Sequence, residues 1–325
     1  MRKASNFDMV LYHGNCADGM SSSWVFWRED VDDRLLYGKC LRDQAPPDVH
    51  NLRVVILDFC YSLEETIKMA EQAKKIVIID HHETSKKLLG KVPKNVEMII
   101  DTSKSGSQLA WDYMYGSLPP WFVNVIAAHD LWRWNEHPEY KYLSDVLYRR
   151  GYYSWPKLEE LYGDTMEHGE EYVIKKIIEQ SKKKIQAAAN NSDPEDELVK
   201  RAIKNAKHNS FLTKYTSPSG KEYTVRLVTC DRKIRSEVGN SLCMDCDFAV
   251  VWQYDLLTNQ WWCACRSRAD GGVDLTKVVE EHGGGGHVSA ASFVIYGDKG
   301  EDLQTYFTII EVPPHREKDA IKYGK

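Results

Sequence analysis

The sequence lacks the features that mark membrane-bound, secreted and strongly basic proteins. Its longest apolar runs are far shorter than the roughly 20 residues that cross a membrane. Residues 1–8 contain no apolar core of the kind found in signal peptides. The formal net charge of −5 argues against attachment to nucleic acid or membrane by bulk positive charge. We therefore expect a cytoplasmic protein with no membrane partner.

Cysteine is also sparse, with eight residues scattered over 325. In a chain of this length without a signal peptide, they are expected to be reduced thiols, because disulfide frameworks belong to small secreted domains. Two pairs are closely spaced, Cys243 with Cys246 and Cys263 with Cys265. Packing is the better interpretation, since the spacing is not that of a standard zinc knuckle, but structural zinc is left open.

The length and the hydrophobic pattern predict two α/β domains. At roughly 150 residues per domain, the chain has room for about two. In residues 1–150, apolar runs at 54–57, 75–79 and 96–100 alternate with helical patterns, as in a parallel sheet. We expect the organisation to be as follows: a first α/β domain at 1–150, a helical linker with a solvated insertion at 151–221, a smaller α/β domain at 222–312 and a loose tail at 313–325.

Polar side chains follow the apolar runs of the first domain directly. They are His13, Asp58, Asp80-His81-His82 and Asp101. The carboxyl ends of parallel strands meet at one edge of a sheet, so these groups are expected to gather there. Aspartate and neutral histidine are ligands for divalent ions such as Mn²⁺, and several at one edge can hold two ions. Asp101 is an equally good cap for the helix that follows it.

These motifs resemble the signature of the DHH phosphoesterase superfamily. Asp80-His81-His82 is similar to the motif that names the family, and five other segments match in order. They are His13 to Gly19, Leu57-Asp58, Ser105-Gly106-Ser107, Ala127 to Asp130, and Arg266-Ser267 with Gly283 to Phe293. The resemblance covers about residues 8–135 and 222–296. It implies a parallel-sheet DHH catalytic domain followed by a smaller α/β domain, DHH-associated, that binds substrate.

The resemblance also implies roles for individual residues. One metal ion would lie near His13 and Cys16, and a second near Asp18, His81 and Asp130, with Asp58 bridging the two. His82 would face the scissile phosphate, binding it or protonating the leaving oxygen, and Asp80 would orient the histidines. The residues expected to bind substrate are Ser105, Gly106, Arg266, Gly284, Gly285, Gly286 and His287.

Cys16 departs from the family pattern, which usually has Asp at this position. A thiolate is a softer ligand than a carboxylate and favours zinc-like ions over Mn²⁺. Cys16 is a ligand that alters the metal preference, or a bystander, or its place is filled by Asn15 or water. We expect two Mn²⁺ ions as cofactors, with Mg²⁺ or another ion as the alternative.

The sequence therefore predicts a metal-dependent phosphodiesterase with its active site between the two domains. It would hydrolyse short oligonucleotides or linear dinucleotides with a metal-activated water, so its partner would be a short nucleic acid or nucleotide. One alternative is a phosphatase of a small phosphorylated nucleotide or of short polyphosphate. A second is an inactive nucleotide-binding or scaffold protein. Oligomerisation is left open.

Overall fold

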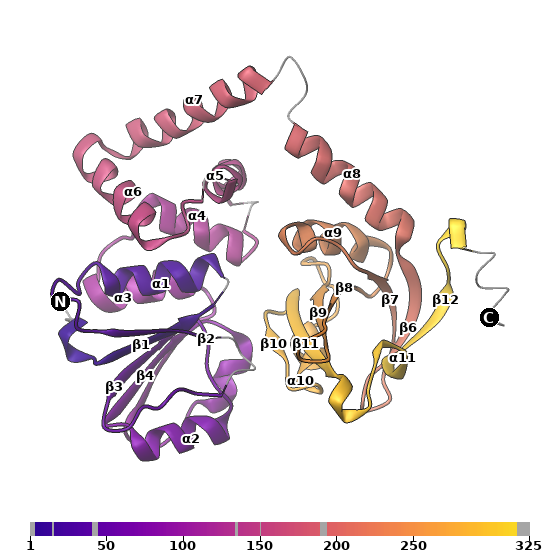
Figure 1. Cartoon of the computed structure of the whole chain (residues 1–325), viewed down its shortest axis with the longest axis horizontal. Coiled ribbons are helices and arrows are strands. Elements are labelled where there is room, and N and C mark those ends of the chain that lie inside the picture. Colours follow the sequence, from indigo (N-terminus) through magenta and orange to yellow (C-terminus); the bar gives the residue numbers. More distant parts are fainter. Residues whose placement is uncertain are drawn as a thin grey trace. The chain divides into compact units, whose positions relative to one another are not determined.

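The chain divides into two compact units, residues 1–187 and 188–325 (Figure 1). The computed structural model describes residues 4–14, 16–40, 45–133, 136–149, 151–188 and 194–316. Asn15, nearly all of the expected insertion at 190–194 and the expected tail beyond residue 316 lie outside these ranges. Each unit is described below by itself.

The first unit is built on a sheet of five parallel strands (Figure 1). The strands are β1 (Met9–His13), β2 (Leu36–Cys40), β3 (Arg53–Leu57), β4 (Lys75–Asp80) and β5 (Val96–Ile100). Their order across the sheet is β2-β1-β3-β4-β5, and every pairing is parallel. The strand that follows β1 in sequence, β2, lies on one side of it, and the next strand, β3, lies on its other side. In open sheets of this order, ligands bind beyond the carboxyl ends of β1 and β3.

Helices cover both faces of this sheet, as the continuous apolar runs predict. The helices of this unit are α1 (Ala17–Trp27), α2 (Leu63–Gln72), α3 (Gly106–Tyr115), α4 (Trp121–Asp130), α5 (Pro138–Arg149), α6 (Trp155–His168) and α7 (Glu170–Ala188). Val55 of β3 packs in the same buried cluster as Trp24 of α1, whereas its neighbour Ile56 packs with Met69 of α2. Successive residues of a strand point to opposite faces, so β3 must be apolar throughout.

The second unit is built on a mixed sheet of seven strands. They are β6 (Phe211–Thr216), β7 (Glu222–Val228), β8 (Phe248–Asp255), β9 (Gln260–Arg266), β10 (Gly285–Gly286), β11 (Ala290–Tyr296) and β12 (Phe307–Glu311). The order is β10-β11-β9-β8-β7-β6-β12, in which β7 and β8 are parallel and the other pairs antiparallel. The helices are α8 (Pro194–Asn209), α9 (Arg235–Leu242), α10 (Leu275–Glu280) and α11 (Leu303–Tyr306).

The α/β class is confirmed for both units, but several elements were not predicted. The sequence analysis predicted neither the helices α5, α9 and α11 nor the strands β2, β6, β10 and β12. The segment 151–221 is also shared between the units. In the first unit, Trp24 Nε1 of α1 donates a hydrogen bond of 2.9 Å to Glu159 of α6, and in the second, β6 pairs with β7.

None of the helices in the described ranges is long and apolar enough to span a membrane.

His282 is expected to make the stability of the second unit depend on pH. Its Nε2 and the Tyr215 hydroxyl share a hydrogen bond of 2.7 Å, and its ring stacks on Phe293 with centroids 4.2 Å apart. Burial lowers the pKa of His282 to about 4. Below about pH 6.5 the unfolded chain therefore binds a proton that the folded chain binds only near pH 4. The free energy of unfolding should therefore fall by roughly 1–2 kcal/mol between pH 6.5 and pH 4, allowing for the partial exposure of the ring.

Urea unfolding of the wild type and of His282→Gln at several pH values between 7 and 4 measures this effect. The variant keeps an acceptor for Tyr215 but cannot take up the proton, so its stability should fall less over this window. An equal fall in both proteins would assign the pH dependence to other groups.

Candidate metal centre

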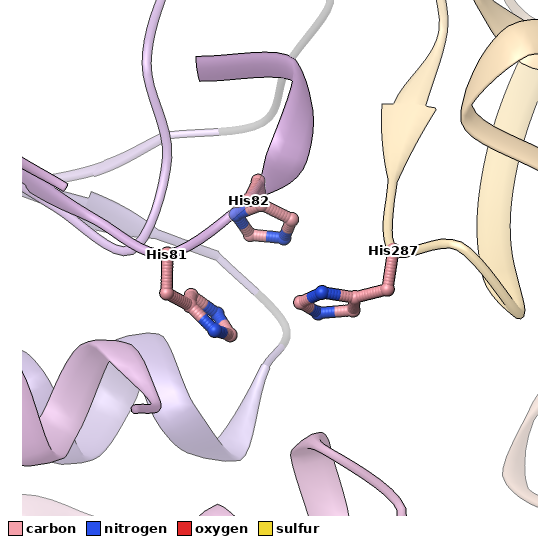
Figure 2. A group of neighbouring side chains, drawn as sticks. All are labelled: His81, His82 and His287. Atoms are coloured by element: carbon pink, nitrogen blue, oxygen red, sulfur yellow. The ribbon is translucent and has the colours of Figure 1, made fainter. Parts of the chain in front are cut away.

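Histidine and aspartate side chains converge at the carboxyl edge of the first sheet. His13 is the last residue of β1, Asp58 follows β3, and His81 and His82 follow β4. Figure 2 shows His81 and His82 side by side at the beginning of the segment that leaves β4. The centre thus lies at the edge where the strand order predicts a ligand.

Asp58 lies between His13 and His81 and contacts both. Its Oδ2 lies 3.3 Å from His13 Nδ1, and its Oδ1 lies 3.0 Å from His81 Nε2. The side chain is 1% exposed, and within the described residues neither oxygen receives a hydrogen bond of good geometry. Asp58 also has a positive φ of 65°, a strained conformation for a residue with a side chain. A strained, buried carboxylate facing two histidines is typical of a functional site.

Asp18 and Asp130 lie around His81, on the second side of Asp58. His81 Nε2 lies 3.6 Å from Asp18 Oδ2 and 3.4 Å from Asp130 Oδ2. Asp18 is fixed by the beginning of α3: the backbone N–H of Gly106 donates to its Oδ2 at 2.6 Å, and that of Ser107 to its Oδ1 at 3.0 Å. The helix N-terminus therefore aims and stabilises this carboxylate.

On the first side of Asp58, Cys16 lies with His13 and stands directly before α1. The ligand atoms of Cys16, His13 and Asp58 all lie within 4.8 Å of one another. A second group with the same property is formed by Asp18, His81 and Asp130. The chain therefore places two potential metal positions next to each other, with Asp58 in contact with a histidine from each.

The electrostatics of the centre favour the binding of a cation. Burial alone would raise the pKa of Asp58, but His13 and His81 lower it well below its usual value. Burial would likewise lower the pKa of His81, yet the surrounding carboxylates raise it well above normal. Burial and the nearby carboxylates raise the pKa of Asp18 well above its usual value. Three carboxylates around one imidazole need a cation to be ionised together.

Divalent ions fit this donor set. Carboxylate oxygens and imidazole nitrogens suit Mn²⁺, Mg²⁺ and zinc-like ions, and Asp58 presents one buried oxygen toward each potential position. Asp18, Asp58 and Asp130 lie close together, and their three negative charges would balance most of the charge of two such ions. The residues present therefore fit divalent ions, while the expected pair of Mn²⁺ ions stays a prediction.

Asp80 holds His82 in a fixed orientation. The two side chains meet at 2.7 Å between Asp80 Oδ1 and His82 Nδ1, and the Ser85 hydroxyl donates to Asp80 Oδ2. Asp80 is fully buried, and despite that burial the neighbouring His82 lowers the pKa of its carboxyl below the usual value. Contact with Nδ1 means that any substrate would be met by Nε2 of His82. Asp80 thus orients His82 in the same way that a carboxylate outside the metal's own ligands orients a histidine in metal enzymes.

Ser105 and Gly106 have partners within the protein. The Ser105 hydroxyl caps α3 by accepting from the N–H of Gln108 at 3.3 Å, and Ser105 is fully buried. Gly106 contacts Asp18 as described. Their contact with substrate stays a prediction. Asp101 accepts hydrogen bonds from the N–H and hydroxyl of Ser103 at 2.9 and 2.6 Å and belongs to none of the potential ligand groups among the described residues.

In the second unit, the expected substrate-binding residues lie around the ends of β9 and β11. Arg266 ends β9 and donates to the carbonyl of Cys265 and to the Ser236 hydroxyl, both at 2.8 Å. Burial lowers the pKa of Arg266 to about 10, so it stays charged at neutral pH. His287 lies in the loop between β10 and β11 (Figure 2). Substrate binding by these residues is not tested by the structure.

The second half of the glycine run at residues 283–286 forms a short edge strand. Gly285 and Gly286 form β10, paired with Ser292 and Ala291 of β11. A Cβ on Gly284 would lie 2.2 Å from the Ser292 carbonyl, and Gly286 has a φ of 145°, so both positions require glycine. The N–H groups of Gly283 and Gly284 already donate to Glu280 and Val279 carbonyls at 2.9 and 2.8 Å. A phosphate would therefore have to be bound by other groups of this segment.

The paired cysteines do not gather into a zinc site among the described residues. Cys263 and Cys265 lie in one buried cluster of the second sheet, and Cys243 in the cluster on its other face. Side chains separated by a sheet cannot share an ion, which supports the packing interpretation.

Two residues that support the centre were not singled out individually from the sequence. Ser107 donates to Asp18 through its N–H and hydroxyl, and Ser85 donates to Asp80. Ser107 belongs to the small-residue motif at residues 105–107, which carries the signal. Ser85 follows His82 by three residues, and no pattern in the sequence marks it.

Gly106 is expected to be essential because it lies against two carboxylates. A Cβ there would be 2.8 Å from Asp58 Oδ1 and 3.0 Å from Asp18 Oδ2. Gly106→Ala should leave α3 intact, since alanine favours helices, but should push both carboxylates aside. We expect the affinity for Mn²⁺, measured by calorimetric titration, to fall at least about tenfold.

Gly163→Ala is the matched control, because a Cβ on this glycine of α6 meets nothing within 4 Å. It should bind Mn²⁺ as the wild type does. Unchanged affinity in Gly106→Ala would mean that the observed positions of Asp18 and Asp58 do not matter for metal binding.

Comparison with known proteins finds one viral relative and several solved structures of similar fold. "Uncharacterized protein R106" of Acanthamoeba polyphaga mimivirus is 24% identical over 312 residues, 90% of this chain and 68% of that protein. No family model matches the chain. The pGpG-specific phosphodiesterase PggH of Vibrio cholerae aligns over 91% of this chain and 96% of its own, with 14% identity and a TM-score of 0.40.

The Mn²⁺ complex of RecJ from Thermus thermophilus is also similar. It aligns over 90% of this chain and 50% of its own, with 14% identity and a TM-score of 0.42. Both TM-scores are below 0.5, so functional inference has to rest on the side chains of this chain. Fold and side chains together define a two-unit α/β protein with a candidate centre for two divalent ions.

Proposed function

We propose that this protein is a metal-dependent phosphoesterase of the DHH type that hydrolyses short oligonucleotides or linear dinucleotides. The observation that carries the proposal is the position of Asp58. Its two buried oxygens face His13 and His81, which belong to adjacent ligand groups. Paired sites of this kind are used for hydrolysis of phosphate esters.

The metal positions would be held by the two groups already described. His13, Cys16 and Asp58 would form one, and Asp18, His81 and Asp130 the other. When bound, the ions supply an activated water and neutralise the charge that develops on the phosphoryl group.

His82 would act directly on the substrate. Its Nδ1 is 2.7 Å from Asp80, which orients Nε2 as the atom that binds the phosphate or protonates the leaving oxygen. Asp80 is itself held by Ser85, so the ring orientation is set before substrate arrives. Because an imidazole can give up or retain its proton near neutral pH, His82 suits either role.

The second unit would bind the substrate through Arg266 and His287. A guanidinium is suited to phosphate because its N–H groups match two phosphate oxygens. Support for a nucleotide comes from the DHH-like motifs in both units, including the glycine-rich segment that carries His287. Two Mn²⁺ ions remain the favoured cofactors for hydrolysis.

A panel of labelled substrates tests this function in the full-length protein. It contains a linear diribonucleotide, RNA of 5 and 24 nucleotides, a 3′-phosphorylated nucleotide and short polyphosphate, each with Mn²⁺, Mg²⁺ or EDTA. We expect hydrolysis of the dinucleotide with Mn²⁺ and none with EDTA, and at least about tenfold slower cleavage of the 24-nucleotide RNA. Hydrolysis of polyphosphate or of the phosphorylated nucleotide alone would favour a phosphatase. Binding of the dinucleotide without turnover under any divalent ion would identify a binding protein.

A further inference from the structure

We propose that Cys16 is a metal ligand and gives the two positions of the centre different metal preferences. The His13–Cys16–Asp58 position would select a zinc-like ion, and the Asp18–His81–Asp130 position a harder ion such as Mn²⁺. The inference rests on the proposed function, since both positions belong to the same centre. When both metals are available, the centre would then hold one ion of each kind.

The first argument is the placement of the thiol. Cys16 Sγ, an atom of the His13 ring and an oxygen of Asp58 all lie within 4.8 Å of one another. Three ligand atoms of three types therefore surround one small volume. Sulfur, nitrogen and oxygen ligands are all found around zinc, at about 2.0 to 2.3 Å from the ion.

The second argument is that Cys16 is a weak cap for its helix. It is the residue that caps α1, with an extended backbone at φ −127° and ψ 137°, but its thiol makes no capping hydrogen bond of good geometry. Its backbone carbonyl accepts from Met20 N–H at 3.1 Å. Serine or aspartate here would stabilise the helix by about 1 kcal/mol. The structure thus has at this position a residue poorly suited to capping and well suited to binding a soft ion.

The third argument comes from Asp58, which is independent of Cys16. Its carboxylate is 1% exposed, and in the described part of the chain neither oxygen takes a well-aligned hydrogen bond. The oxygen on the side of His13 is 3.3 Å from that imidazole. A buried anion directed into the His13–Cys16 group indicates that a cation binds there.

The two positions differ in chemical softness. The Asp18–His81–Asp130 group offers two carboxylates and one imidazole, and no cysteine belongs to it. Carboxylates suit Mn²⁺ and Mg²⁺, whereas thiolates favour zinc-like ions, which also lie above Mn²⁺ in general affinity order. With one equivalent of each ion, Zn²⁺ would therefore fill the position that contains the thiol and leave the Asp18–His81–Asp130 position to Mn²⁺.

X-ray absorption at the zinc edge tests whether sulfur is a ligand. The metal-free full-length protein is loaded with one equivalent of Zn²⁺. We expect one sulfur neighbour at about 2.3 Å, and none in Cys16→Asp or Cys16→Ser. Cys60→Ser is the control, because Cys60 is also partly exposed and its thiol lies 2.9 Å from the Ser85 hydroxyl. This variant should keep the sulfur neighbour, and circular dichroism checks that all variants are folded.

Competition provides a second readout. Metal-free protein is equilibrated with equal amounts of Zn²⁺ and Mn²⁺, and bound metal is measured after gel filtration. The wild type should retain one of each, and the excess of Mn²⁺ needed to displace half of the bound Zn²⁺ should be about 10- to 100-fold smaller in Cys16→Asp.

The outcomes separate this inference from the proposed function. No sulfur neighbour in the wild type, or one that persists in Cys16→Asp, overturns the role of Cys16, while hydrolysis of the dinucleotide with Mn²⁺ would leave the proposed function standing. A wild type that binds neither ion overturns both. Sulfur lost only in the Cys16 variants, together with the changed metal ratio, supports the mixed-metal centre.

Discussion

Asp58→Asn is expected to reduce hydrolysis of a linear dinucleotide by about 10³-fold or more, equivalent to about 4 kcal/mol of transition-state stabilisation. The change is nearly isosteric, so the backbone conformation at φ 65° should persist, since Asn tolerates the left-handed region as well as Asp does. The neutral amide removes the negative charge that faces both His13 and His81 and replaces one oxygen by an N–H donor.

The measurement combines turnover with calorimetric titration of Mn²⁺. The affinity for Mn²⁺ should fall at both potential positions together, because Asp58 contacts a histidine in each. Asp101→Asn is the control, as this carboxylate also follows a strand of the same sheet but bonds Ser103. It should retain full activity. Near-normal activity in Asp58→Asn would remove the basis for a centre built around this residue.

His82→Ala is expected to lower turnover about 10²- to 10⁴-fold while leaving metal binding nearly unchanged. His82 shares a potential ligand group with Asp58, Asp80 and His81 but belongs to neither of the two groups proposed to hold the ions, and its Nδ1 is engaged by Asp80, so its loss should affect the reaction more than the metals. The KM for the dinucleotide should change much less than kcat if His82 protonates the leaving oxygen, and by a similar factor if it binds the phosphate.

A substrate with an activated leaving group distinguishes these two roles. Such a leaving group departs without protonation, so His82→Ala should cleave a nitrophenyl phosphodiester at a rate close to that of the wild type if the role is general acid catalysis. An equal defect on both substrates would favour phosphate binding. Loss of Mn²⁺ affinity in the same variant would contradict a separate role for His82.

The first sheet and its carboxyl edge could be predicted from sequence because buried apolar residues give way abruptly to aspartates at the ends of the strands. The runs at β3 and β4 are apolar and buried on both faces after their first residue, and Asp58 and Asp80 mark their ends. Strand β2 was missed because its sequence contains a glycine and a lysine and is not an apolar run. Strands β6 and β12 were missed because each has few fully buried residues and lies between helical and turn-rich segments.

The ligand groups were suggested by position, whereas their supporting contacts were not. The order of motifs singled out His13, Asp18, Asp58, His81 and Asp130, and the structure brings these five side chains together. The close approach of Gly106 to two carboxylates and the support of Asp80 by Ser85 depend on packing between elements distant in sequence. No local pattern encodes such contacts.

The central claim is that water, activated in this centre, hydrolyses a phosphodiester. The most direct measurement is hydrolysis of a linear dinucleotide in ¹⁸O-labelled water, with mass spectrometry of the nucleotide products. We predict one ¹⁸O atom in the phosphate of the released nucleotide with Mn²⁺ present, and no product with EDTA or in Asp58→Asn. Products without ¹⁸O, or turnover that persists in EDTA, would contradict the account.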